Sequence, residues 1–286
     1  MKPKKIYKDI HSKIKQYDIV FSRNQQGFSV IGQDIVSPYP IITLCHQGSA
    51  RLLYNRREYT LSKNDLFVTM PNNVMNQIES SEDCILTRII ISDKLFEEVH
   101  NIVSTNYDTA RFGPVCKLKE DRAELLLKII DALEDIVSYN AKTFLIRHQL
   151  VLSQLFVLLE FIHFQYLSKK IIKSVRPNSE YYERFCKLII EHYKESRLVQ
   201  FYANLLNLTP KHFTKVIKQE TGGVSAAAFI EQYVVAQAKL LIETQPEKTL
   251  GEIAYELGFP DPTSFYRYFK RVAGMTAKQY KKSYTG

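Results

Sequence analysis

The stretches FYANLLNLTPKHFTKVIK (201–218) and EIAYELGFPDPTSFYRYFK (252–270) decide the fold. They are two copies of one pattern, aligned first on alanine and leucine positions. The second copy then has one additional residue, Pro260, after which the two copies keep a constant offset. An internal repeat of this kind predicts two similar structural units in the C-terminal part of the chain.

Each copy is predicted to form a helix, a tight turn and a second helix. Asn207 and Gly258 stand where the chain must reverse, and both residue types tolerate the left-handed conformation that ends helices. Thr209 and Asp261 can then cap the next helix, and a proline follows each at the first helical position. This spacing is that of a helix-turn-helix.

The second helix of each copy is predicted to have an apolar face and an opposite, cationic face. Phe213, Val216 and Ile217 recur at helical spacing and are expected to point inward. A solvated lysine face is the common alternative, but two such faces in register argue against it. In a helix-turn-helix the second helix enters the DNA major groove, where lysine, arginine and threonine can contact base edges. The outward residues are Lys211, Thr214, Lys215 and Lys218 in the first copy and Thr263, Tyr266, Arg267 and Lys270 in the second.

The segment between the copies supports their pairing on one duplex. Residues from Ser225 to about Thr244 are predicted to form one helix, about 28 Å long. Successive major grooves on one face of B-DNA are about 34 Å apart, so this helix could hold two recognition helices in adjacent grooves. The chain from Pro262 onward has basic residues and no acidic ones. We expect contacts to the DNA backbone from Lys218, Lys270, Arg271, Lys278 and Lys281.

The rest of the chain divides into two patterns. Residues 16–115 contain short segments rich in β-formers at roughly ten-residue spacing, which predicts an antiparallel barrel or sandwich. Residues 119–167 change to helical periodicity and are predicted to form a pair of helices. The basic run SKKIIKSVRPNS (168–179) is a predicted linker. The predicted domains are therefore residues 1–167 and 180–286, in an α+β multidomain chain.

Residues from about 180 to 284 resemble the DNA-binding domain of AraC/XylS-type transcription regulators. The residues that carry the resemblance are Tyr202-Ala203, Leu206, Thr209-Pro210, Val216–Gly222, Ala238–Leu241, Ile253-Ala254, Gly258-Phe259, Phe265, Arg267 and Phe269-Lys270. The resemblance implies two helix-turn-helix units joined by a long helix, binding to double-stranded DNA and to RNA polymerase, and usually activation of transcription. It implies base contacts by Lys211, Thr214, Lys215, Thr263, Tyr266 and Arg267. Ala277 and Lys281 depart from the usual proline and arginine of the family.

The front half is similar, more loosely, to the cupin-like barrel found in many of these regulators. The run GSARLLYNRREYTLSKNDLFVTMP (48–71) carries this similarity, and it implies a cupin-like β-barrel with a helical hairpin, used for sensing or dimerisation. Because His46 stands alone, we expect no metal and no other cofactor. Strand alternation makes Leu44, His46, Leu52 and Tyr54 candidates for an effector pocket. Candidates for dimerisation are Leu145, Leu152, Leu155 and Leu159.

Composition narrows the functional class. The 286 residues are 45% hydrophobic with a formal charge of +9, which fits a folded protein with a polyanionic partner. Four scattered cysteines suit a reducing cytoplasm, the basic N-terminus is no signal peptide, and the apolar run 151–164 is too short to cross a membrane.

No P-loop, dinucleotide fingerprint or nucleophile elbow is present, so we expect no enzyme activity. The sequence predicts a homodimeric, sequence-specific transcription regulator with a small-molecule effector. One alternative is a ligand-independent regulator whose barrel only dimerises. The other is a cupin enzyme fused to a DNA-binding domain, and the barrel interior would discriminate among them.

Overall fold

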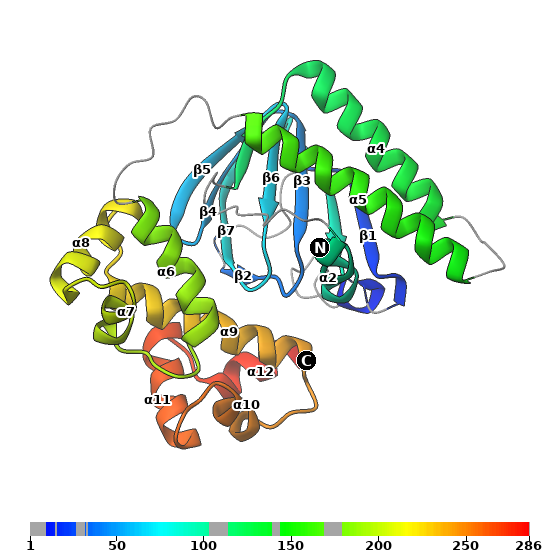
Figure 1. Cartoon of the computed structure of the whole chain (residues 1–286). Coiled ribbons are helices and arrows are strands. Elements are labelled where there is room, and N and C mark those ends of the chain that lie inside the picture. The colour runs from blue at the N-terminus through cyan, green and yellow to red at the C-terminus, as the bar shows by residue number, and fades with distance from the viewer. Residues whose placement is uncertain are drawn as a thin grey trace.

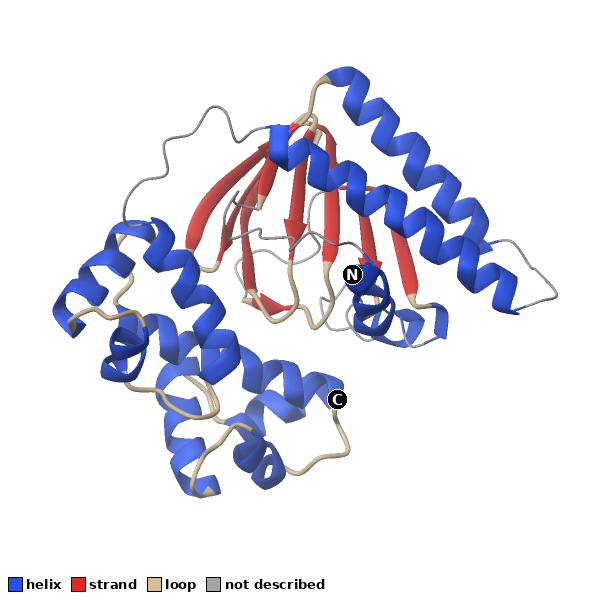
Figure 2. Ribbon diagram, viewed as in Figure 1, coloured by secondary structure: helices blue, strands red, loops and turns tan. Residues whose placement is uncertain are grey.

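The computed structural model describes residues 10–14, 16–26, 32, 34–102, 114–138, 144–168 and 179–285. The N-terminal part is built on two antiparallel sheets flanked by helices, and the C-terminal part is helical throughout (Figure 2). This is the α+β, two-part architecture predicted from the sequence. The predicted linker lies mostly outside the described residues: Ser168 ends one helix, Ser179 begins the next, and 169–178 are not described.

Among the described residues, the larger sheet has five strands in the order β1-β8-β3-β6-β9. Residues of alternate positions face opposite sides, so Ile42 pairs with both Val68 and Ile89 on one face. The strands are β1 (Ile19–Gln26), β8 (Ile85–Ile91), β3 (Ile41–Gln47), β6 (Asp65–Thr69) and β9 (Val115–Lys117).

The smaller sheet has four strands in the order β2-β7-β4-β5. Its β4–β5 hairpin turns at Asn55 and Arg56, which both have positive φ (49° and 67°) as a two-residue hairpin turn requires. The strands are β2 (Ile35–Val36), β7 (Val74–Ser80), β4 (Ser49–Tyr54) and β5 (Arg57–Ser62).

The two sheets form an open sandwich, one of the two arrangements predicted from the strand pattern, so the cupin-like barrel is open rather than closed. Among the described strands no ladder joins one sheet to the other. The sheets meet instead through side chains: Phe67 and Leu86 of the larger sheet and Leu52 and Leu61 of the smaller one share a buried cluster. On both sheets every second side chain points inward, so this layer is buried without hydrogen bonds between the edges of the sheets. The same alternation occurs in a closed barrel, so the sequence alone does not distinguish the two arrangements.

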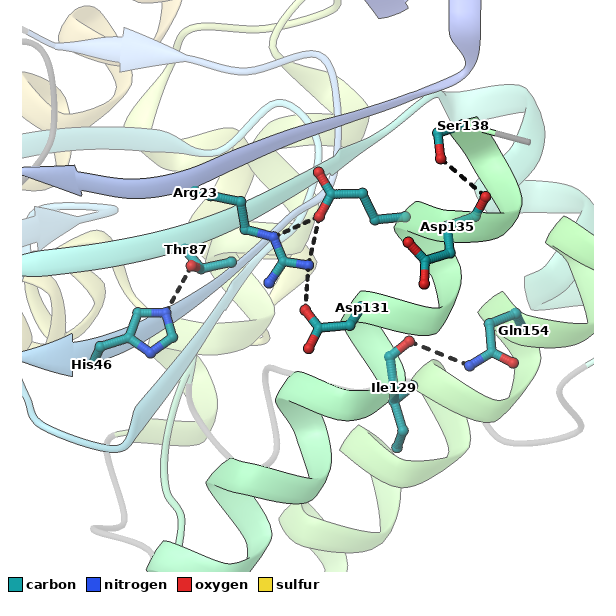
Figure 3. A network of polar contacts seen from close by, with 9 residues as sticks. Arg23, His46, Thr87, Ile129, Asp131, Asp135, Ser138 and Gln154 are labelled. Atoms are coloured by element: carbon teal, nitrogen blue, oxygen red, sulfur yellow. Dashed lines mark hydrogen bonds and ion pairs between the residues drawn. The ribbon is translucent and has the colours of Figure 1, made fainter. Parts of the chain in front are cut away.

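Helices cover the outer face of the larger sheet. α4 (Glu120–Ser138) and α5 (Phe144–Ser168) form the predicted pair, and α5 runs across the sheet in Figure 1. Their apolar side chains join Ile42, Leu66 and Ile89 in the largest core of the N-terminal part. Arg23 of β1 adds a polar contact to this packing, because its guanidinium donates to Asp131 and Glu134 of α4 (Figure 3).

A further helix, α2 (Asp93–Ile102), lies within the region predicted to be entirely β. Asp93 stands in its first turn, and Leu95 and Val99 bury one face at helical spacing. This short amphipathic helix follows the preceding strand almost directly in the sequence. The change from strand to helical periodicity was therefore not recognised.

In the C-terminal part, the described residues 179–285 form seven helices around two cores. α9 belongs to both cores, because Phe229 and Tyr233 lie in the first and Val234 and Ile242 in the second. Its extent matches the long helix predicted from the sequence. The helices are α6 (Ser179–His192), α7 (Val199–Leu205), α8 (Pro210–Glu220), α9 (Ala226–Thr244), α10 (Leu250–Glu256), α11 (Pro262–Ala273) and α12 (Ala277–Thr285).

Candidate nucleic-acid interface

Helices α7 and α8 form one helix-turn-helix, and α10 and α11 form the other. The turn residues Asn207 and Gly258 adopt the predicted left-handed conformation, with φ of 56° and 74°. The Thr209 hydroxyl accepts from the backbone N–H of His212 at 3.2 Å, which caps α8 as predicted.

The second unit is capped in the same way. The Asp261 carboxylate accepts from the Ser264 backbone at 2.9 Å and from the Ser264 hydroxyl at 2.6 Å. These hydrogen bonds lower the pKa of Asp261, so the cap is ionised at neutral pH and complements the N-terminal end of α11. A capping box of Thr249 and Glu252 begins α10, and Thr276 and Gln279 make the same pair of hydrogen bonds before α12.

Each second helix has the predicted buried face. Phe213, Val216 and Ile217 of α8 are fully buried, and so are Phe265 and Phe269 of α11. Burial of these faces leaves the opposite side of each helix directed to solvent.

The structure places the six predicted base-contacting residues on these outward faces. Thr214 is half-buried, and the side chains at the other five positions are exposed: Lys211, Lys215, Thr263, Tyr266 and Arg267. Each face therefore presents donors and a cation from the first half of its helix, as reading of a major groove requires.

A close packing contact fixes the second unit against the first. Gly258 lies so near the α6–α7 connection that a Cβ atom built on it would be 1.9 Å from the Lys194 carbonyl oxygen. From the same connection, the Arg197 guanidinium lies 3.7 Å from the Phe259 ring centroid and donates to the Leu257 carbonyl. The sequence did not single out Arg197, because its partners are about sixty residues away.

The five residues predicted to contact the DNA backbone fall into two groups. Lys218, Lys270 and Lys278 are exposed. Arg271 instead donates to both carboxylate oxygens of Glu231 in α9, at 2.9 and 3.0 Å, and lies over the Tyr268 ring. Lys281 donates to the Lys248 carbonyl. These two residues already have partners within the domain.

The four candidates for an effector pocket lie on two different faces. Leu44 is in the core between the larger sheet and the helices, whereas Leu52 and Tyr54 are in the layer between the sheets. His46 lies on the helix side, with its Nε2 atom 2.7 Å from the Thr87 hydroxyl (Figure 3). Burial and the positive charge of Arg23 lower the pKa of His46.

Two polar side chains that the sequence did not single out belong to the layer between the sheets. Gln77 pairs with Leu52 in the β7–β4 ladder, so its side chain shares the inward face. Only 1% of Gln77 is exposed, and neither polar atom of its amide has a hydrogen-bond partner among the described residues. Arg88 is two residues after the inward-facing Leu86 on β8, so its side chain lies on the same face of the strand. Burial lowers the pKa of Arg88 to about 10. The buried amide of Gln77 requires a partner, such as water or a ligand.

The predicted dimerisation residues belong largely to the core of their own domain. Leu155 and Leu159 are buried there, Leu152 packs at its margin, and the Leu145 side chain is outside the description. The exposed apolar side chains of α5 include Leu150, Val157 and Phe164, which recur every seven residues. Leucines at helical spacing identify the buried face, and these three identify the solvent face.

Other classes of site are not apparent in the part of the chain that the structure describes. There, no cluster of three or more histidine, cysteine or acidic side chains is arranged to hold a metal ion. The described helices include none with the length and apolarity needed to span a bilayer.

Two helix-turn-helix units on a shared central helix define a DNA-binding class of domain. Residues 202–283 match the domain family described as "Helix-turn-helix domain". The C-terminal part is a helix-turn-helix domain of the AraC type, which confirms the resemblance stated from the sequence.

Curated relatives match part of the chain. An uncharacterized HTH-type transcriptional regulator of Escherichia coli, YpdC, is 25% identical over 112 residues, 39% of each chain. Another from Bacillus subtilis, YisR, is 29% identical over 92 residues, 32% of this chain and 31% of its own. The chain therefore spans less than half the length of these relatives. Among solved structures, ToxT from Vibrio cholerae is 14% identical, with 92% of this chain and 96% of that chain covered and a TM-score of 0.45.

Proposed function

We propose that the protein is a sequence-specific, DNA-binding regulator of transcription that acts as an activator through RNA polymerase. The observation that carries this is the pair of outward faces on α8 and α11, whose positions align and which both carry a cation at Lys215 and Arg267 and at Lys218 and Lys270. A solvated surface helix needs no such match. Because α9 belongs to both cores, it holds the two faces in one fixed relation, as binding to consecutive grooves of one duplex requires.

The proposal assigns base reading to Lys211, Thr214, Lys215, Thr263, Tyr266 and Arg267. Backbone contacts are assigned to Lys218, Lys270 and Lys278, which are exposed beside the reading faces. Phosphate contacts contribute affinity on any sequence, whereas the reading residues contribute preference.

The N-terminal domain, residues 1–167, is proposed to dimerise and to bind a small-molecule effector. The buried amide of Gln77 supports effector binding between the sheets, because its two polar atoms have no described partner. The apolar stripe of Leu150, Val157 and Phe164 on α5 supports dimerisation. Nothing in this proposal requires catalysis.

Selection from a random duplex library with the full-length protein tests the DNA-binding proposal. The selected duplex is then titrated with the wild type, Lys215→Ala and Arg267→Ala. Each substitution is expected to cost about 1–3 kcal/mol on the selected sequence and to relax preference at one position. Lys128→Ala, which removes an exposed charge from α4, is the control and should bind as the wild type does. No enrichment of any sequence, or unchanged affinity and preference in both variants, would refute the assignment.

A further inference from the structure

The N-terminal sandwich and the first helix-turn-helix unit share a buried contact. Val36 and Val74 of the smaller sheet belong to the same apolar cluster as Phe185 of α6 and Phe213 of α8. Figure 1 shows α6 and α9 lying at this end of the sheet. The contact is therefore part of the buried core of the first helix-turn-helix unit, rather than a contact between two exposed surfaces.

Hydrogen bonds to turn carbonyls fix this contact in one register. The Tyr182 hydroxyl of α6 donates to the Asn55 carbonyl in the β4–β5 turn. The Tyr233 hydroxyl and the Gln237 amide of α9 both donate to the Asn72 carbonyl, at 2.9 and 3.1 Å. Because a backbone carbonyl has a fixed position, these bonds specify an orientation as well as a contact.

Arg57 is the charged centre of the same contact. Its Nη1 atom donates to the Glu183 carboxylate of α6 at 3.0 Å, and its Nη2 atom is paired with the Glu220 carboxylate of α8. The guanidinium also lies 4.9 Å from the centroid of the Tyr182 ring. The Glu220 side chain is only 6% exposed, so one arginine holds two carboxylates in a largely dry position.

The position of Glu220 connects this ion triad to DNA recognition. Glu220 is the last residue of α8, about 7.5 Å along the helix from Lys215. Lys211 and Lys215 remain exposed while the domains are in contact, so the contact does not cover the reading face. It fixes the direction in which that face points.

We propose that Arg57 is a positioning residue for DNA recognition: through Glu183 and Glu220 it sets the orientation of α8 relative to the N-terminal domain. Removal of its side chain takes away the two ion pairs and the contact with the Tyr182 ring that hold α6 and α8 against the smaller sheet. A change in the sandwich that moves the β4–β5 turn would reach α8 by the same route. This inference rests on the proposed DNA binding and goes beyond it by naming the link between the domains.

The test uses the full-length protein and the duplex that the wild type selects. Arg57→Ala is expected to weaken binding about 5-fold or more, the lower end of ordinary coupling between sites. It should also speed amide hydrogen exchange in α6 and α8, without changing exchange in α10 to α12. Arg51→Ala is the matched control, because the ion pairs of Arg51 with Glu58 and Glu79 lie within the smaller sheet. It should leave both readouts unchanged.

A triple variant separates positioning from charge. Arg57→Ala combined with Glu183→Gln and Glu220→Gln removes the two carboxylates that would otherwise repel phosphates. If Arg57 positions α8, the triple variant stays weak in binding and fast in exchange. Recovery of wild-type affinity would overturn the proposal, because it would reduce the effect to electrostatic repulsion.

A fold check keeps the result unambiguous. Arg57→Lys, which retains the charge, is measured beside Arg57→Ala, and both are melted thermally. If Arg57→Ala does not fold, Arg57→Lys should still show faster exchange in α8 than the wild type, since lysine lacks the fork that reaches both acids. Wild-type exchange and affinity in a folded Arg57 variant would overturn the inference. Failure of the wild type to select any duplex would instead overturn the proposed function.

Discussion

At the scale of single residues, Gly258 is constrained by both conformation and space. Its φ of 74° disfavours side chains, and an added Cβ would meet the Lys194 carbonyl. Gly274 has nearly the same φ, 73°, but no described atom within 4 Å of such a Cβ. Gly274→Ala should therefore cost about 1–2 kcal/mol in the free energy of unfolding, and Gly258→Ala roughly twice that or more. Chemical denaturation of both variants checks this, and equal losses would contradict the close contact.

Gln77 gives a second prediction at this scale, with the opposite sign. Its buried amide has no described partner, so an apolar side chain of similar length avoids a desolvation cost. Gln77→Met should raise stability by about 1–3 kcal/mol and the melting temperature by several degrees. Gln149→Met, on the surface of α5, should change little. A lower melting temperature for Gln77→Met would mean that the amide is already satisfied in solution.

Local chemistry explains which residues of the candidate site could be predicted. The roles of the turn residues and helix caps depend on backbone conformation and hydrogen bonds within a few positions of the chain. Residue type and spacing were therefore enough to predict them for Asn207, Gly258, Thr209 and Asp261. Arg57 could not be found this way, because Glu183 and Glu220 lie 126 and 163 positions away. Residues that act across domains carry no short-range pattern.

At the scale of elements, two neighbouring cations on α11 have different surroundings, although both were predicted from the sequence to contact the DNA backbone. Lys270 is exposed, whereas Arg271 is neutralised by Glu231, which raises the pKa of Arg271 and ties α11 to α9. Lys270→Gln should lower the slope of log affinity against log salt by about 1, the value for one phosphate contact. Arg271→Gln should change that slope by less. Titrations of the selected duplex at several salt concentrations measure both slopes, and equal changes would show that Arg271 leaves Glu231 to bind phosphate.

The strands show what sequence periodicity can and cannot predict about the N-terminal sheets. Within residues 16–115, which were predicted to contain short strands, Ile41–Gln47, Ser49–Tyr54 and Ile85–Ile91 are strands, because alternation and turn residues agree there. Alternation says which residues face inward but not which strands pair at the edges. The choice between a closed barrel and an open sandwich therefore required the structure.

At the scale of the whole molecule, the helix α5 has two faces with different roles. Leu155 and Leu159 are buried in the N-terminal core, so charges placed there would unfold the domain and say nothing about assembly. The opposite face is exposed at Leu150, Val157 and Phe164, to 46%, 46% and 57%. Three exposed apolar side chains on one side of a helix are a surface that a second copy of the chain can cover, so this face is the proposed dimer contact.

Val157→Glu, at the centre of that stripe, should convert the dimer to a folded monomer, because it places a charge in an apolar interface. Light scattering after gel filtration measures the mass, and circular dichroism verifies the fold. Gln149→Glu adds the same charge on the same helix outside the stripe and should remain dimeric. A dimer that binds two sites gains about 10²–10⁴ in avidity, so Val157→Glu should also lose affinity for a two-site duplex and keep affinity for a single site. A folded Val157→Glu variant that stays dimeric would exclude this face and direct the search for the contact elsewhere on the N-terminal domain.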